Sequence, residues 1–128
     1  MSMYQMLLSI NPEHVENILS GTKQYEFRKV RCRESVNKIL IYSTAPEKMV
    51  VAEAWIEEVI EDTIDIVWQM TCELSGISKE FYEAYYEGKE RAVAYKLSNV
   101  KKFPKPKVLS DYGLRCAPQS FAYVEAAR

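Results

Sequence analysis

Three charged side chains lie close together in the sequence and are the first candidates for chemistry: Lys23, Glu26 and Arg28. The run that carries them reads as a β-strand, in which side chains alternate between the two faces. Glu26 and Arg28 therefore share one face, while Tyr25 and Phe27 point to the other and can pack on a core. A carboxylate and a guanidinium on one face can bind the polar edge of a base or a ribose. On an open surface the same two groups would be an ion pair of little energetic value.

Lys23 precedes this strand and could bring its ammonium group to the same side. Burial, or a cationic neighbour such as Arg28, would lower its pKa and suit it to general acid/base chemistry or to holding a phosphate. The alternative is a structural role, because a Lys just after a helix complements the negative end of the helix dipole.

Two turns carry the remaining candidates. Tyr42 ends an apolar run and can stack on a base or donate a proton; Ser43 follows it, and Lys48, which could contact a phosphate, comes shortly after. Gln119 and Ser120 follow a proline, and their side chains could bond to a base or to a scissile phosphate. The ordinary alternatives are aromatic packing for Tyr42, local turn bonding for Ser43, Gln119 and Ser120 and a solvated charge for Lys48.

These residues must be positioned by an alternation of strands and helices. Strands are predicted at residues 3–10, 23–30, 37–42, 49–60, 91–100 and 121–124. The helices are predicted to begin at Pro12 after an Asn11 cap, after a cap at Asp62 or Thr63, and at Lys79 after a Ser78 cap. Gly21 should end the first helix in a left-handed conformation. This order fits an α+β protein built on a mixed, curled sheet with flanking helices.

Other residues are assigned to packing or to solvent. Trp55 and Trp68 are expected in the core, and His14 is expected to be an exposed helix residue. Three tyrosines have helical spacing and should pack rather than bind: Tyr82, Tyr85 and Tyr86. Residues 103–107 are expected to be an extended connector, and residues 108–114 have no clear assignment.

Length and composition limit the function classes. We expect one domain over residues 1–128. A net charge of −1 argues against sequence-independent duplex binding, which needs a strongly basic domain. A local basic groove stays open, and one lysine-rich run reads either as a solvated loop or as a guide for a nucleic-acid backbone: Lys101, Lys102, Lys105 and Lys107.

Three widely spaced cysteines and a single histidine make a disulfide framework, a metal site or another cofactor unexpected. No secretory signal is recognised, and no apolar run approaches the roughly 20 residues needed to span a bilayer. We therefore expect a cytoplasmic protein with reduced thiols and no membrane span. The oligomeric state does not follow from the sequence.

Five motifs in order resemble the ASCH domain family: Leu8-Ser-Ile-Asn-Pro, Ile18-Leu-Ser-Gly-Thr-Lys, Tyr25-Glu-Phe-Arg, Ile41-Tyr-Ser-Thr-Ala-Pro and Pro118-Gln-Ser-Phe. The resemblance runs from about Met6 to Val124 and implies a PUA-like small β-barrel with attached helices. It also implies binding or processing of RNA in a cleft formed by Lys23, Glu26 and Arg28, with the Tyr42–Lys48 turn and the Gln119–Ser120 turn nearby.

The resemblance leaves three functions open. The first is a binding module for RNA or a nucleotide. The second is an enzyme: ribonuclease-like members use a Tyr, a Lys and a Ser, which Tyr42, Lys48 and Ser120 could supply with help from Lys23. Amidohydrolase members have a Thr three residues after the Lys, where this chain has Glu26, so that activity ranks lower. The third is a protein-interaction module using the tyrosine-rich helix.

Overall fold

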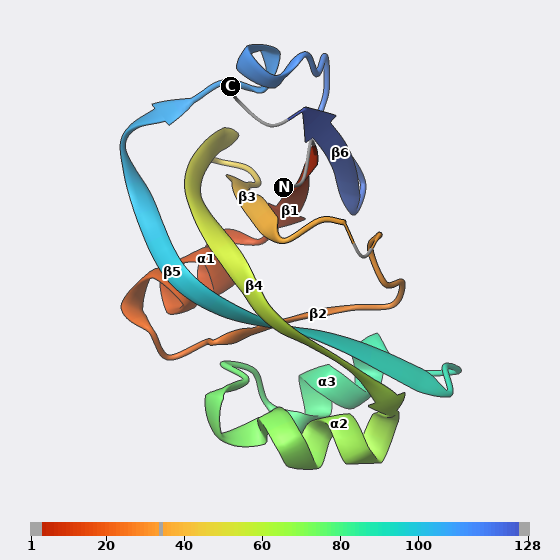
Figure 1. Ribbon diagram of the computed structural model, residues 1–128. Helices are drawn as coiled ribbons and strands as arrows, with labels where there is room; N and C mark the ends of the chain where they lie inside the picture. The colour runs from red at the N-terminus through yellow and green to blue at the C-terminus, as the bar shows by residue number, and fades with distance from the viewer. Residues whose placement is uncertain (1–3, 34, 126–128) are drawn as a thin grey trace.

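In the part of the chain that the computed structural model describes, residues 4–33 and 35–125, one mixed sheet holds six strands. Their order across the sheet is β2-β5-β4-β3-β1-β6 (Figure 1). The strands are β1 (Tyr4–Ile10), β2 (Tyr25–Arg28), β3 (Lys38–Ser43), β4 (Met49–Thr63), β5 (Arg91–Lys107) and β6 (Phe121–Glu125). The helices are α1 (Pro12–Ser20), α2 (Ile64–Thr71) and α3 (Lys79–Tyr85), with short 3-10 turns η1 (Cys72–Leu74) and η2 (Leu109–Tyr112).

The predicted α+β class and order of elements are confirmed, but the sheet is curled rather than closed. Strands β1 and β3 are parallel, and every other neighbouring pair is antiparallel. Its two outer strands, β2 and β6, do not pair in the described residues. The barrel expected from the family resemblance therefore remains an open sheet here.

Strands β4 and β5 form a long curved ribbon through the length of the molecule (Figure 1). Three register shifts interrupt their pairing, and such bulges increase local twist and bend a strand. The segment expected to be an extended connector, residues 103–107, instead continues β5 as far as Lys107. Its two prolines are tolerated because β2 pairs only with Val93–Lys96, which leaves the later residues at the edge of the sheet.

The predicted helix caps are confirmed. The Asn11 side chain accepts a hydrogen bond from the Glu13 amide, and Pro12 is the first helical residue. Gly21 ends α1 with a left-handed φ of 90°, a conformation that Gly adopts at no steric cost. Thr63 and Ser78 cap α2 and α3 through their hydroxyl oxygens.

Two apolar clusters lie on either side of β2. One packs α1 against the sheet around Ile18 and Ile41, and the other packs α2 and α3 under the sheet around Tyr82 and Tyr86. The predicted packing role of these two tyrosines is confirmed. The prediction for Trp55 is wrong, because this side chain is 40% exposed beside a register shift between Glu53 and Trp55.

No helix among the described residues has the length and apolar character needed to cross a membrane.

Gly76 allows the helical segment to approach the start of β2. Its φ is +69°, and a Cβ atom added there would lie 2.3 Å from the Cβ of Lys23. The Gln24 amide donates to the Leu74 carbonyl oxygen at 2.8 Å on the same side. The backbone of Gly76 therefore packs directly against the Lys23 side chain, and a residue larger than Gly does not fit there.

We expect Gly76→Ala to lower the free energy of unfolding by about 1–3 kcal/mol more than Gly88→Ala, because the added methyl group overpacks the contact with Lys23. Gly88 is the matched control, since its φ is +78° and nothing lies within 4 Å of its added Cβ. Urea unfolding of both variants measures the difference. Equal losses would show that only the left-handed backbone matters at Gly76.

Candidate functional site

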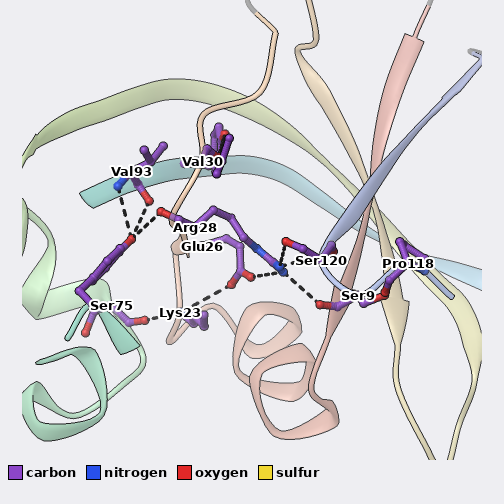
Figure 2. Close-up of polar contacts among 11 residues, drawn as sticks. Ser9, Lys23, Glu26, Arg28, Val30, Ser75, Val93, Pro118 and Ser120 are labelled. Atoms are coloured by element: carbon purple, nitrogen blue, oxygen red, sulfur yellow. Dashed lines mark hydrogen bonds and ion pairs between the residues drawn. The ribbon is translucent and has the colours of Figure 1, made fainter. Parts of the chain in front are cut away.

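The carboxylate of Glu26 lies between two cations, Lys23 just before β2 and Arg28 at its last residue. Arg28 Nη2 donates to Glu26 Oε2 at 2.7 Å, and Lys23 Nζ lies 3.8 Å from Glu26 Oε1 (Figure 2). All three residues are buried. The predicted common face of Glu26 and Arg28 is confirmed, and Lys23 does bring its ammonium group to that face. The cluster carries one net positive charge when all three groups are ionised.

Lys23 has the most enclosed ammonium group of the described chain, with only 2% of the residue exposed. Its Nζ donates to the Ser75 carbonyl oxygen at 2.9 Å and lies 4.9 Å from the centre of the Phe27 ring. Burial lowers the pKa of Lys23 below its usual 10.5, the Glu26 carboxylate raises it, and the Arg28 guanidinium lowers it again. Burial is the largest effect because an ammonium group loses its hydration there.

Arg28 joins the cluster to the opposite edge of the sheet. Nη2 donates to the Ser9 carbonyl oxygen at 3.0 Å, and Nη1 donates to Ser120 Oγ at 3.1 Å (Figure 2). Its Nε is buried and has no hydrogen-bond partner among the described residues. An unsatisfied buried donor costs about 1–3 kcal/mol. A ligand that accepts a hydrogen bond from this N–H would remove that cost.

A hollow of about 150 Å³ opens beside the cluster. Lys23, Glu26 and Arg28 form its polar side, and four elements supply the rest of the lining: Ser9, Ile10, Asn11, His14, Phe27, Ile77, Phe81 and Tyr85. Drug-sized ligands usually occupy about 300–1,000 Å³. The hollow therefore suits one base, sugar or phosphate group better than a whole nucleotide.

His14 is a member of this site that the sequence interpretation missed. Its ring lies edge-on to Phe81 with centres 5.3 Å apart, and its Nδ1 is buried without a partner in the described residues. Burial lowers the pKa of His14 below 6.5, with a further lowering from Lys23, which favours the neutral ring. The available signal was its spacing of four from Ile18, which puts it beside the buried stripe of α1.

The other predicted site residues gather at the ends of β1 and β3 but do not line the hollow. Ser9 lies opposite Tyr42 in the parallel pairing and donates its amide to the Ser120 carbonyl oxygen at 3.0 Å. Tyr42 is only 5% exposed and packs in an apolar cluster with Leu7. Ser9 therefore lies between Tyr42 and Ser120, on the far side of Arg28 from Lys23.

Ser43 is buried one position after Tyr42, opposite Ile10. Lys48 is exposed in the following turn with a left-handed φ of 54°, and Gln119 is exposed beside Ser120. Of the eight predicted site residues, the structure brings four into direct contact: Lys23, Glu26, Arg28 and Ser120.

All three cysteines are free, with Cys32 buried and Cys72 and Cys116 exposed. Among the residues that the structure describes, no three His, Cys, Asp or Glu side chains are grouped so that they could hold a metal ion.

The charge cluster predicts an asymmetry between two substitutions. Glu26→Gln should destabilise the fold by about 3–5 kcal/mol, because it leaves Lys23 and Arg28 buried with no carboxylate. Lys23→Met removes one buried charge, keeps the Glu26–Arg28 pair, and leaves the Ser75 carbonyl oxygen without its donor, so it should cost only about 1–3 kcal/mol. Urea unfolding at pH 7 measures both, and the opposite order would contradict the assigned roles.

The same pair of proteins gives a pH test. The pKa of Lys23 is lower in the folded protein than in the unfolded chain, so the unfolded chain holds more protons above the folded pKa. Stability rises with pH wherever the unfolded state binds more protons. The wild type should therefore gain stability relative to Lys23→Met as the pH rises toward 10.5, and a constant difference would mean that Lys23 titrates normally.

Comparisons with known proteins identify the relatives of this chain. The family model described as ASCH domain matches residues 8–107. The large ribosomal subunit protein uL22 of Ureaplasma parvum serovar 3 is 33% identical over 121 residues, which cover 94% of this chain and 39% of that protein. The chain thus spans about two fifths of the length of this relative. An ASCH domain-containing ribonuclease of Zymomonas mobilis is 31% identical over 94 residues, covering 73% of this chain and 64% of that protein.

The crystal structure of ASCH from Zymomonas mobilis has the same fold, with a TM-score of 0.85, 27% identity, and coverage of 94% of this chain and 87% of that one. Two variants of that protein, one with a Tyr changed to Phe and one with a Ser changed to Ala, give TM-scores of 0.85 and 0.84. The family resemblance inferred from the motifs is confirmed, and the chain belongs to the ASCH domain family.

Proposed function

We propose that this domain binds single-stranded RNA and takes one nucleotide unit of it into the hollow beside Lys23, Glu26 and Arg28. The observation that carries the proposal is the buried cluster of two cations and one carboxylate at an open hollow. A buried ion pair is weak support for stability, because well-packed apolar residues often do as well. A buried group with an uncompensated positive charge is better explained by an anionic or polar ligand.

The polar side of the hollow offers both acceptors and donors. Glu26 Oε2 is held by Arg28, whereas Oε1 is 3.8 Å from Lys23 Nζ, which is beyond hydrogen-bonding distance. That oxygen can accept from an amino group of a base, and the Lys23 ammonium can hold a phosphate or carbonyl oxygen. The mixture suits a nucleotide, which presents both kinds of group.

The wall of the hollow is aromatic. Phe81 and Tyr85 on α3 and His14 on α1 line it, and the His14 and Phe81 rings are in edge-to-face contact. Proteins that read single-stranded RNA commonly stack an unpaired base on such rings and bond to its edge. Phe81 is half exposed in the free domain, so a stacked base would cover a ring that the fold leaves open.

The stacking role of Phe81 can be tested directly. We expect Phe81→Ala to weaken binding of a fluorescein-labelled single-stranded RNA about tenfold, since one base–aromatic stack contributes about 1–3 kcal/mol. The matched control is Met70→Ala, which removes an equally exposed apolar side chain from α2, away from the hollow. Fluorescence anisotropy measures both. Unchanged affinity in Phe81→Ala, or an equal loss in Met70→Ala, would count against the hollow as the binding site.

A second candidate function is metal-independent cleavage of RNA. It is favoured by the similarity to a protein named as a ribonuclease. In the Zymomonas variants the substituted residues are a Tyr and a Ser, the two hydroxyl types that Tyr42 and Ser120 provide on either side of Ser9. Cleavage by the neighbouring 2′-hydroxyl needs a base for its proton, a cation for the developing charge and an acid for the leaving oxygen.

Several residues of this rim could fill those roles. Neutral His14 can accept a proton, protonated Lys23 and Arg28 can stabilise charge, and Ser120 or Tyr42 can donate from a hydroxyl group. Lys48 lies in the next turn and can contact the scissile phosphate. In this reading the RNA strand would cross from the hollow over the ends of β1 and β3.

If the domain cleaves RNA, cleavage should persist in EDTA and should be lost in Lys23→Met or Lys48→Ala while Lys89→Ala remains active. Loss in Lys23→Met alone would place the chemistry at the hollow, and loss in Lys48→Ala alone would place it at the turn after β3. If protonated Lys23 is required, the rate should fall as the pH rises through its lowered pKa, below 10.5. Cleavage that is equal in all variants would point to a contaminating nuclease.

A further inference from the structure

We propose that a lysine-lined edge of the sheet binds the phosphate backbone of the RNA strand whose base occupies the hollow. This lysine edge consists of Lys48 and the outer half of β5: Lys101, Lys102, Lys105 and Lys107. The proposal rests on the proposed function and adds a second surface to it, well separated in sequence from the charge cluster of β2.

The fold leaves this edge open. Beyond Leu97, whose amide donates to the Gln24 carbonyl oxygen, no described residue pairs with the side of β5 that faces away from β4. On the β4 side, Ala52 pairs with Lys102 and Val50 pairs with Lys107. Two steps along β4 thus match five along β5, so the residues between Lys102 and Lys107 bulge out.

The turn before β4 adds Lys48 to the same end. Lys48 lies two residues before Val50, whose register partner is Lys107, so residues far apart in the sequence meet at one rim. In Figure 1 the outer half of β5 rises beside the beginning of β4 at the end of the ribbon opposite α2 and α3. The structure therefore gathers five lysines that the sequence places in two separate segments.

Acidic side chains lie near two of the five lysines: Glu16 and Glu47 line the hollow that Lys102 lines, and Asp111 lines another with Lys107. None of these lysines forms an ion pair with a carboxylate of residues 4–33 or 35–125. The nearest acid across the strands, Glu53 opposite Lys101, is bound to Lys38 at 3.1 Å. Lys107 Nζ lies over the ring of Phe103 at 4.8 Å, which holds the charge in place without cancelling it.

Charge is strongly segregated between the two ends of the molecule. Residues 96–116 contain six basic side chains and one acidic one, whereas residues 61–90, which include α2 and α3, contain eight acidic side chains and two basic ones. A polyanion is therefore attracted more strongly to the lysine edge than to the helical end, so most of the backbone should follow the edge while one nucleotide enters the hollow beside α3. The overall net charge of −1 conceals this separation.

The lysine edge and the hollow are neighbours across the beginning of α1. Lys102 lines a second hollow together with Pro12 and Ser43, and Asn11 lines the first hollow with Lys23. Asn11 and Pro12 are consecutive in the chain, so the two hollows adjoin at the start of α1. A strand that lies along the lysine edge reaches the hollow by passing over the start of α1.

The competing explanation is protection of an exposed sheet edge. Lysines and prolines on an edge strand prevent pairing with other chains, and β5 has both between Lys101 and Lys107. Charge reversal separates the two explanations. A Glu protects an edge as a Lys does, but it repels phosphate.

The test measures anisotropy of a labelled single-stranded RNA of about 16 nucleotides, the upper end of single-strand site sizes, and binding of the four nucleoside 5′-monophosphates by NMR. Three proteins are compared with the wild type: Lys101→Glu/Lys102→Glu, the matched reversal Lys79→Glu/Lys89→Glu on the α3 side, and Phe81→Ala. Size-exclusion chromatography and urea unfolding establish that each is folded and not aggregated. Vesicles with and without anionic lipid provide a second polyanionic surface.

The expected result is a loss of at least about tenfold in RNA affinity for Lys101→Glu/Lys102→Glu, with little change for Lys79→Glu/Lys89→Glu and unchanged monophosphate binding. A milder variant, Lys101→Gln/Lys102→Gln, should lower the slope of log affinity against log salt by about 1.4, or about 0.7 for each lost phosphate contact.

RNA affinity that is unchanged in Lys101→Glu/Lys102→Glu but reduced in Phe81→Ala would overturn the lysine edge and leave the hollow intact. Equal losses in both reversals would also overturn it, because they would reflect total charge. Absence of RNA and monophosphate binding in the wild type would refute the proposed function and this inference together. Binding to anionic vesicles, with no binding to RNA, would assign the lysines to a membrane surface and overturn the proposal.

Discussion

The carboxylate of Glu26 holds together three segments that are far apart in the sequence. Lys23 on one side of it binds the Ser75 carbonyl oxygen below β2, and Arg28 on the other side binds Ser9 and Ser120 at the opposite edge of the sheet. Strand β2 is only four residues long; besides its pairing with β5 it is held by the Tyr86 hydroxyl, which donates to the Arg28 carbonyl oxygen. The cluster thus links the segment before α3 to the end of β1, and the hollow is lined from both sides.

Stability alone does not account for this arrangement. Moving two cations and a carboxylate out of water costs several kcal/mol for each ion, and an apolar cluster of the same volume would avoid that cost. The cluster is also incompletely satisfied, since Arg28 Nε and the neighbouring His14 Nδ1 lack partners in the described chain. A ligand in the hollow that bonds to these unsatisfied groups would remove the cost of leaving them without partners. This is the physical reason to connect the cluster with binding.

The features that depend only on neighbouring residues could be predicted from the sequence. The Asn11 and Ser78 caps, the Gly21 turn and the shared face of Glu26 and Arg28 follow from positions a few residues apart. Trp55 was misplaced because its residue type was weighed above its position: it shares the outer face of β4 with Glu53 and Glu57, opposite the buried Ala52 and Ala54. His14 was missed because its partner Phe81 comes from a distant helix. The sequence placed Tyr42 and Lys48 near Lys23 through family motifs, whereas the sheet puts them beyond Ser9.

The lysine-rich run shows that the net charge of a whole chain does not predict the charge of one of its surfaces. A net charge of −1 correctly argues against a uniformly basic domain, but potential at a surface depends on which charges lie within about 8–10 Å of it at physiological salt. The long β4–β5 ribbon places the lysines at one end and the acidic helices at the other (Figure 1). The lysine edge therefore presents its own positive field to a strand, and the curled, open sheet determines that this field lies next to the hollow.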